Sequence, residues 1–316
     1  MAEPQRQASA EVPVREPSRF RPLFVLTTAR SYSSVVTTMI GQHPELTALP
    51  ELKLFAYGTI GELAASLPHY WIKRGIKHRS PGLVRAVAQF EFGNQTPVAL
   101  AAAQKWLEDR AHCSGPDIFD LLLDRISPRT AVEKSPENVE TDDALRRLAA
   151  AYPKARYLHL TRHPVATQRS MLEHLKRTVP GFSEPEQPML GIACWVETHC
   201  RILGFAASLP RHAYFRVKAE EVLNDNYLQL RSIAAWMGIR VDDTALEAMR
   251  HPEDSPFASP GPAESGIIGG NDPGFLRDPV PHPVAVPRTL ERPHGWVGNS
   301  ALWQRTVALA NRLGYP

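Results

Sequence analysis

The chain has 316 residues, of which 43% are hydrophobic, and its formal net charge is only +3, from 36 basic and 33 acidic side chains. This length is enough for one large domain, while the small charge excess argues against a nucleic-acid binder but still allows a local basic pocket. No stretch approaches the roughly 20 apolar residues of a membrane span, and three cysteines without a CxxC pair favour a reducing cytoplasm.

The first ordered element is predicted at residues 23–26. Residues 1–20 are rich in Pro, Glu, Arg and Ser and are predicted to form a disordered tail, which leaves residues 21–316 as a single domain. The apolar run 23–26 is typical of a buried strand. A polar turn follows, and then a helix over residues 34–42 that ends near Gly41 and Pro44.

The middle of the chain is predicted to be mostly helical. Residues 54–125 contain no clear strand pattern and are interrupted by four prolines, so we interpret them as a helical insertion that covers a pocket. A strand is predicted at residues 130–133. A helix is predicted at residues 142–152, with Asp142 as its N-cap.

Strands and helices alternate in the second half. Strands are predicted at residues 157–161 and 214–217, and helices at residues 165–177, 187–207, 227–237 and 301–313. Residues 251–293 are rich in Pro and Gly with little periodicity, and irregular stretches of that length are usually functional or linkers. The alternation predicts an α/β fold, a three-layer sandwich whose central parallel sheet is flanked by helices.

A polar loop joins the first strand to the first helix. Its sequence is TARSYSS, residues 28–34. Backbone N–H groups at a helix start lack partners and lie at the positive end of the dipole, so such a turn binds phosphate or sulfate. Ser31, Ser33 and Ser34 add hydroxyl donors and Arg30 a positive fork. Alone, the run fits a simple helix cap equally well, and it lacks the GxxxxGK[ST] pattern of a Walker A motif.

A second strand–loop–helix unit carries the sequence LHLTRHPVATQRSM, residues 158–171. Arg162 stands at the carboxyl end of its strand, where open α/β sheets bind ligands. Pro164 suits the first helical turn. Ser170 follows about two turns later and could contact the same anionic ligand as Arg162. A lone arginine here would be interpreted as structural, whereas two such units in one chain favour an anion site.

These two segments resemble the cofactor-binding elements of sulfotransferases that use 3′-phosphoadenosine-5′-phosphosulfate (PAPS). TTARSYSSVV resembles the 5′-phosphosulfate loop, usually PRSGTT or PKSGTT, and TRHPVATQRSM resembles the 3′-phosphate element. Further likeness lies in residues 41–46, 49–55, 133–136 and 270–275, which resemble the family's xxHPxL, PELHL, DKSP and GDPxF segments. The pattern is closest to sulfotransferases of polyketide and nonribosomal peptide assembly lines. Tyr32 departs from the usual loop glycine, and Lys53 from a histidine common in those relatives.

The resemblance implies a P-loop-like sandwich and a sulfotransferase that moves a sulfuryl group from PAPS to a hydroxyl of a small-molecule or carrier-bound natural-product acceptor. In that scheme residues 54–125 shape the acceptor pocket and residues 251–293 cover the cofactor. The implied cofactor-binding residues are Thr28, Arg30, Ser31, Tyr32, Ser33, Ser34, Arg162, Ser170, Gly270 and Phe275.

The catalytic roles are also implied by the resemblance. Arg30 and Lys134 are the candidates to stabilise developing charge, so no metal is required. Glu51 is the first candidate for the general base, because protein-tyrosine sulfotransferases place a catalytic glutamate at a similar offset from the loop. His199 is the rival base, although a histidine on the apolar face of a helix is more commonly a core residue.

Two other functions stay open at this point. A nucleotide-dependent phosphotransferase, or kinase, would share the anion loop but needs magnesium and a Walker-type lysine. A non-catalytic nucleotide-binding module would bind the nucleotide without turnover. The expected partner is a small-molecule acceptor, with neither nucleic acid nor membrane.

Overall fold

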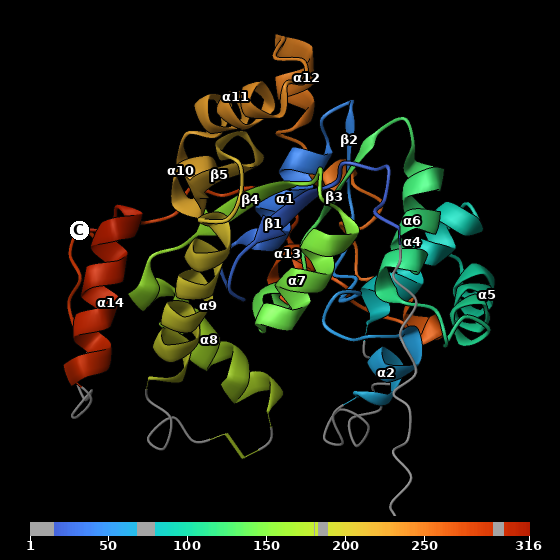
Figure 1. Cartoon of the computed structure of the whole chain (residues 1–316), viewed down its shortest axis with the longest axis horizontal. Coiled ribbons are helices and arrows are strands. Elements are labelled where there is room, and N and C mark those ends of the chain that lie inside the picture. The colour runs from blue at the N-terminus through green and yellow to red at the C-terminus, as the bar shows by residue number, and fades with distance from the viewer. Residues whose placement is uncertain (1–15, 68–79, 180, 183–188, 293–299) are drawn as a thin grey trace, which may run out of the picture.

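A five-stranded parallel sheet forms the centre of the computed structural model, which describes residues 16–67, 80–179, 181–182, 189–292 and 300–316. Its strand order is β2-β3-β1-β4-β5, so β1 lies in the middle, between β3 and β4. The strands are β1 (Leu23–Leu26), β2 (Leu46–Ala48), β3 (Thr130–Glu133), β4 (Arg156–Thr161) and β5 (Tyr214–Lys218). With helices on both faces (Figure 1), this arrangement confirms the predicted α/β sandwich.

The alternation of side chains along β1 explains the three layers. Leu23 and Val25 point to one face and pack with α1 (Ser33–Gly41), α10 (Ala219–Asn224), α11 (Asn226–Met237) and α12 (Asp243–Ala248). Phe24 and Leu26 point to the other face, where they meet the residues of α4 (Pro81–Glu91), α6 (Gly115–Ile126) and α7 (Asp142–Ala151). All four residues of β1 are buried, as a strand covered on both faces requires.

The remaining helices extend the sandwich at its ends. The region predicted to be helical contains α2 (Ile60–Ala65), α4, α5 (Pro97–Glu108) and α6, with residues 68–79 of it outside the described part. On the opposite side of Figure 1, α8 (Pro164–Thr178) packs against α9 (Leu190–Ala206), and α14 (Ser300–Leu313) packs against α9. Short 3-10 turns occur at η1 (Pro136–Val139), η2 (Arg211–Ala213), η3 (Pro252–Asp254) and η4 (Ala263–Ser265).

Two local predictions were wrong. β2 was not among the predicted strands, because three residues are too few for an alternating pattern, even though Pro44 and Pro50 flank them. Asp142 was predicted as the N-cap of α7, but the cap is Thr141, whose hydroxyl accepts from the N–H of Ala144 at 3.1 Å. Thr141 has the extended backbone of a cap residue, and Asp142 is the first helical residue.

The irregular segment is described over residues 251–292, where it contains α13 (Pro273–Arg277) and the short turns η3 and η4. The fully buried Arg85 of α4 anchors it, donating from Nη1 to the carbonyl of Gly269 at 2.7 Å and from Nε to Gln95 at 2.7 Å. Burial lowers the pKa of Arg85 to about 10. An irregular segment therefore rests on a specific buried cation.

Both ends of the described chain are tied to the domain. Residues 1–15 of the predicted tail lie outside the described part, but Ser18 is buried and donates from its N–H to Ala151 and from Oγ to Asp120. At the other end, the buried hydroxyl of Tyr315 lies 2.9 Å from Thr161 Oγ1.

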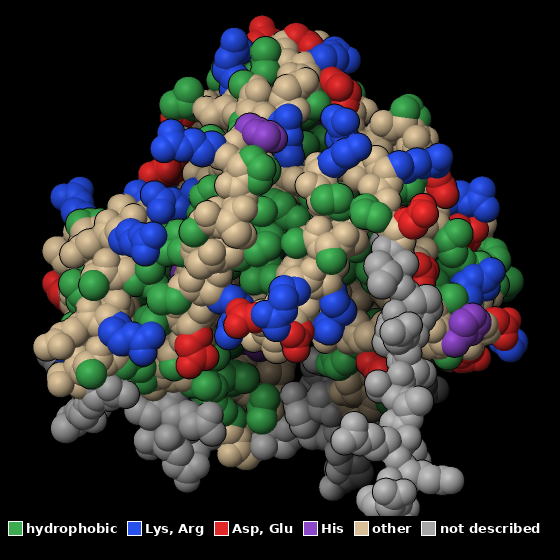
Figure 2. All heavy atoms as spheres, in the orientation of Figure 1, with side chains coloured by type: hydrophobic (Ala, Val, Ile, Leu, Met, Phe, Trp, Pro, Cys, Tyr) green, Lys and Arg blue, Asp and Glu red, His purple; other side chains and the backbone are tan. Residues whose placement is uncertain are grey.

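On the face seen in Figure 2, basic and acidic side chains are interspersed. None of the helices in the described ranges has the length and apolarity to cross a membrane.

Candidate active site

A cavity of about 1240 Å³ opens at the carboxyl edge of the sheet. Its walls come from the loop after β1, the start of α8 after β4, the segment after β2 and the irregular segment 268–287. Carboxyl ends of parallel strands are where open α/β sheets bind ligands. Of the predicted site residues, the wall includes Arg30, Ser31, Tyr32, Ser33, Ser34, Glu51, Arg162, Ser170, Gly270 and Phe275.

The loop after β1 has an unusual backbone. Arg30 and Tyr32 have φ angles of 67° and 57°, in the left-handed region that favours glycine, and Tyr32 is the N-cap of α1. The N–H groups of the first turn of α1 have no intrahelical partners and lie at the positive end of its dipole. Ser31 Oγ is buried and has no hydrogen-bond partner among the described residues. The loop therefore presents unsatisfied donors suited to an anion.

Tyr32 contacts the second predicted arginine. Its hydroxyl accepts from Nη2 of Arg162 at 2.9 Å, and the guanidinium carbon of Arg162 lies 3.8 Å from the ring centroid. Nη1 of Arg162 donates to the carbonyl of Arg30 at 2.6 Å, and Trp195 donates to the carbonyl of Arg162 at 2.9 Å. Nε of Arg162 is buried without a partner in the described part of the chain. Burial lowers the pKa of Arg162, which still remains a cation at neutral pH.

Arg30 connects the two predicted anion-binding elements. Its Nε donates to Ser170 Oγ at 3.2 Å, and its Nη1 forms an ion pair with Asp272. The pKa of Arg30 is lowered first by burial and then by the neighbouring charge of Arg162. Two strand–loop–helix units 132 residues apart in the chain are thus joined at one point, because β1 and β4 are adjacent in the sheet.

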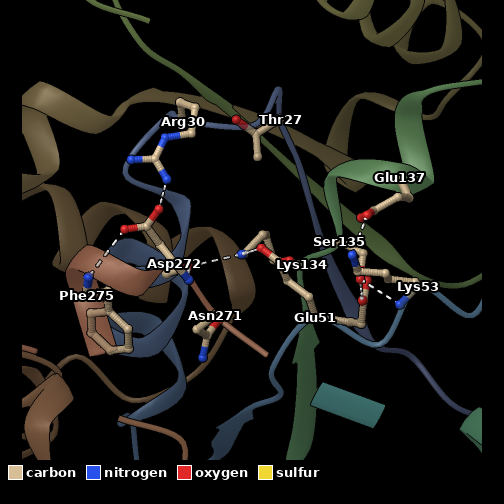
Figure 3. Close-up of polar contacts among 12 residues, drawn as sticks. Thr27, Arg30, Glu51, Lys53, Lys134, Ser135, Glu137, Asn271, Asp272 and Phe275 are labelled. Atoms are coloured by element: carbon tan, nitrogen blue, oxygen red, sulfur yellow. Dashed lines mark hydrogen bonds and ion pairs between the residues drawn. The ribbon is translucent and has the colours of Figure 1, made fainter. Parts of the chain in front are cut away.

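Lys134 reaches the site from the end of β3. Its ammonium donates to Glu51 Oε1 at 2.5 Å, and Figure 3 labels both residues. It also donates to Ser34 Oγ at 3.2 Å. The side chain of Lys134 is buried, and that of Glu51 is about one-fifth exposed to the cavity. The structure therefore brings the candidate base, a buried cation and the anion loop into direct contact.

A buried chain of hydrogen bonds joins the segment after β2 to the loop after β3, next to Glu51 and Lys134. Lys53, at φ 61°, donates its N–H to Ser135 Oγ at 2.9 Å, and Ser135 donates to Glu133 Oε1 at 2.5 Å. Asn138 also donates to Glu133, at 2.6 Å. Burial raises the pKa of Glu133 to about 7, against the opposing effect of those hydrogen bonds. The ammonium of Lys53 pairs with Glu137 at 2.7 Å, so Lys53 lines the cavity as one half of an ion pair.

The irregular segment closes over the loop. The N–H of Glu51 donates to the carbonyl of Gly270 at 2.7 Å, and the N–H of Asp272 donates to Ser34 Oγ at 3.0 Å. Gly270 has φ 98°, and a Cβ added there would lie 2.6 Å from the Cα of Gly82. Only glycine fits at this crossing, which places the segment directly against the site.

Some predicted residues lie elsewhere. His199 is fully buried in α9, 2.8 Å from the His159 ring nitrogen and edge-on to Trp195, and is absent from the cavity wall. Burial lowers its pKa to about 3. Thr28 is buried and does not line the cavity. The structure thus places His199 as a core histidine, away from the candidate base Glu51.

Asp272 is a site residue that the sequence analysis did not single out. An aspartate before a proline is a helix-start signal, and its Oδ1 does accept from the N–H groups of Gly274 and Phe275. That signal indicates a cap but gives no indication of the ion pair with Arg30, which joins positions 242 residues apart.

The residues present fit a small polyanion. Arg30 and Arg162 line the cavity, and the buried Lys134 adds a third cation that contacts the lining residues Ser34 and Glu51. Two buried polar atoms, Ser31 Oγ and Arg162 Nε, have no hydrogen-bond partner among the described residues. Ser34 Oγ accepts from both Lys134 and Asp272, which leaves its own O–H free to donate. Within the described ranges, no group of three or more His, Cys, Asp or Glu side chains is arranged to hold a metal ion.

Comparisons with known proteins agree with this geometry. The sequence model described as the sulfotransferase family matches residues 22–243. The sulfotransferase domain from the curacin biosynthetic pathway has a similar structure, with a TM-score of 0.73 and 20% identity over 95% of this chain and 99% of that domain. The sulfotransferase domain from the Synechococcus PCC 7002 olefin synthase has a TM-score of 0.68 and 24% identity over 96% of this chain and 98% of that domain. No curated protein sequence matches significantly.

Proposed function

The chain belongs to the sulfotransferase family, and we propose that it transfers a sulfuryl group from PAPS to a hydroxyl group of an acceptor. One observation carries the proposal. The loop after β1 and the first turns of α8 meet through Arg30, Arg162 and Ser170, and the ammonium of Lys134 bridges Ser34 of the same loop to Glu51. The elements that would hold the two ends of the donor and the candidate base therefore share one cavity.

The donor would be held mainly by charge and by loop amides. Arg162 and Ser170 would bind the 3′-phosphate, with Tyr32 orienting Arg162. The N–H groups of the first turn of α1 and the hydroxyls of Ser33 and Ser34 would bind the 5′-phosphate. The unpartnered Ser31 Oγ and Arg162 Nε provide two further donors. The loop needs no Walker lysine for this, because Lys134 enters from β3 instead.

The transfer itself is an in-line displacement on sulfur. Glu51 takes the proton from the acceptor hydroxyl, whose oxygen forms the new bond to sulfur. The bond between sulfur and the bridging phosphate oxygen breaks, and its electron pair leaves with adenosine 3′,5′-bisphosphate (PAP). Arg30 and Lys134 stabilise the charge that develops on the sulfuryl and leaving oxygens. These two cations give the scheme its positive charge without a metal.

We further propose an acceptor from natural-product biosynthesis, free or bound to a carrier protein. Residues 49–55 and 133–136 support this through their likeness to assembly-line sulfotransferases, and two similar folds come from a biosynthetic pathway and an olefin synthase. The cavity of about 1240 Å³ exceeds the usual 300–1,000 Å³ of a single-ligand pocket, so a nucleotide and an acceptor fit together.

Three unpaired cysteines support a cytoplasmic location.

A turnover assay tests the function. Purified protein is mixed with PAPS and a panel of phenols, primary and secondary alcohols and 3-hydroxyacyl pantetheine thioesters, with excess EDTA, and PAP release and sulfated product are measured. We expect turnover of at least one class in EDTA. Phosphate transfer from ATP and magnesium instead would favour a kinase, and tight PAP binding without any product would favour a non-catalytic module.

Glu51→Gln tests the base. The amide keeps an oxygen that can accept from Lys134 but cannot take a proton, so we expect kcat to fall by about 100-fold or more while the Kd for PAP, measured calorimetrically, stays within threefold of wild type. The rival is checked with His199→Asn, assayed at a temperature where the variant is folded. Full turnover by Glu51→Gln, or an equal loss in His199→Asn, would contradict the assignment.

A further inference from the structure

Asp272 contacts three parts of the candidate site at once. One carboxylate oxygen accepts from the N–H groups of Gly274 and Phe275 and so caps α13. The other oxygen pairs with Nη1 of Arg30 (Figure 3). The backbone N–H of Asp272 donates to Ser34 Oγ. Its side chain is about one-quarter exposed and lines the cavity.

These contacts hold the guanidinium of Arg30 from two sides. Nε is fixed by Ser170, on α8, and Nη1 by Asp272, on the irregular segment. An arginine side chain has several rotatable bonds, and its planar guanidinium contributes to catalysis only when it is oriented toward the reacting atoms. With both contacts in place, the side chain of Arg30 is 17% exposed and lines the cavity, so its remaining N–H groups are available to a ligand.

The charge of Asp272 argues against a role as a donor ligand. A carboxylate beside a polyanion opposes its binding by Coulomb repulsion, and this repulsion is stronger in a partly buried site than in water. Arg30 and Arg162 already line the cavity, and the buried ammonium of Lys134 contacts its wall at Ser34 and Glu51, so positive charge to attract the donor is present. A negative charge at position 272 is therefore expected to cost donor affinity, and its benefit has to lie in the geometry of Arg30.

Resting on the function proposed above, we propose that Asp272 is a positioning residue that aims Arg30 at the sulfuryl group when the irregular segment lies over the anion loop. The same residue joins the segment to the loop through Ser34 and to α13 through its cap. Because the carbonyl of Gly270 is bonded to Glu51, the segment fixes the base and the cation together. The same segment therefore contacts the backbone of the candidate base and the side chain of the candidate cation.

Two variants separate aiming from capping. In Asp272→Asn, one oxygen can still cap α13, but the amide nitrogen faces Arg30 with hydrogens and cannot accept from it. We expect kcat to fall about 10-fold or more. The assay uses PAPS and the best acceptor of the panel, or hydrolysis of PAPS by water if the protein accepts none of the panel. The Kd for PAP should be unchanged or up to threefold tighter, since a repulsive charge is lost. Asp272→Ala also removes the cap and should lower Tm in addition.

A double-mutant cycle tests whether Asp272 acts through Arg30. Arg30→Lys keeps the charge and loses the fork, so Asp272→Asn on that background should lower kcat by less than threefold. Glu264→Gln is the matched control, since it removes one negative charge from an exposed position of the same segment. We expect it to match wild type in kcat and in Kd for PAP.

Three results would overturn the proposal: wild-type kcat in Asp272→Asn, an equal loss of kcat on both backgrounds, or weakened PAP binding at unchanged kcat. Failure of the wider function looks different. If the wild-type protein neither binds PAP nor consumes PAPS, the proposed sulfotransferase activity fails. If wild type turns over PAPS and Asp272→Asn equals it, only the role of Asp272 fails.

Discussion

The side chain of Tyr32 makes contacts that a glycine could not make at the same position. Its φ of 57° costs a non-glycine residue about 1–2 kcal/mol. In return, the hydroxyl and the ring both bind Arg162, through a hydrogen bond and a cation–π contact at 3.8 Å. The sequence shows only that a usual glycine is absent. The structure shows what the tyrosine contributes there, which is two contacts to the arginine of the second candidate anion-binding unit.

Glu133 gives a pH-dependent prediction at the same scale. Burial holds its pKa near 7 in the folded chain, above the ordinary value of 4.5, so the folded state binds more protons between these two pH values. The free energy of unfolding should therefore fall as pH rises from 4.5 through 7, by about 3 kcal/mol in total. Below pH 4.5 this contribution is fully present.

Urea unfolding of wild type and Glu133→Gln at pH 5, 6, 7 and 8 measures the effect. Glutamine does not titrate, and other titrating groups are common to both proteins, so the difference between the two curves isolates Glu133. We expect wild type to lose stability relative to the variant as pH rises. Parallel curves across this range would show that the carboxyl of Glu133 has an ordinary pKa.

At the scale of elements, a single buried side chain secures the irregular segment. Arg85 extends from α4 and binds Gln95 and the carbonyls of Pro256 and Gly269. Its replacement removes all three of these hydrogen bonds, whereas the segment has little regular structure of its own. The covering segment thus depends on a helix of the insertion that precedes it by about 170 residues.

Arg85→Met should lower the free energy of unfolding by about 3 kcal/mol and raise the KM for PAPS. The stem of methionine keeps much of the apolar packing, so the loss reports the three hydrogen bonds. Arg125→Met is the control, because Arg125 is exposed and pairs with Glu91 on the same helical region. Thermal unfolding of both variants checks the predicted loss of stability in Arg85→Met. Equal midpoint temperatures for Arg85→Met and Arg125→Met would contradict the prediction.

Elements with a strong pattern were predictable, and those defined by a few residues were not. The apolar runs of β1, β3 and β4 and the periodicity of α7 and α11 predicted these elements from local sequence. Three-residue β2 has too little sequence for any period. The true cap of α7 lies one residue before the predicted Asp142, since Thr141 can also cap a helix.

At the scale of the whole molecule, the adjacency of β1 and β4 decides where the site forms. The sequence indicated two anion-binding units and a candidate base, but not that Arg30 would lie against Ser170 or that Lys134 would reach Glu51. Those contacts depend on strand order, which no local pattern contains. His199 shows the same limit, because its helical face could be predicted but the distance of that face from the cavity could not.

The end of the chain also supports the site through packing. The hydroxyl of Tyr315 donates to Glu220 at 3.1 Å, and Glu220 accepts from the N–H of His163, which follows Arg162. Tyr315→Phe should lower the free energy of unfolding by about 1–2 kcal/mol and weaken PAP binding several-fold. Tyr227→Phe, which removes an exposed hydroxyl bonded to Asp243, should change neither quantity. Calorimetry with PAP that finds both variants equal to wild type would contradict this coupling.

Three residues of the described chain other than glycine have a positive φ, and all three line the candidate site: Arg30, Tyr32 and Lys53. Glycine would relieve the unfavourable backbone at these positions, which makes them tempting targets for anyone who engineers the protein for heat resistance. It would also remove the contacts of Arg30 with Asp272, of Tyr32 with Arg162 and of Lys53 with Glu137. Such substitutions would give up these contacts together with side chains of the candidate site, so gains in heat resistance have to be sought elsewhere in the fold.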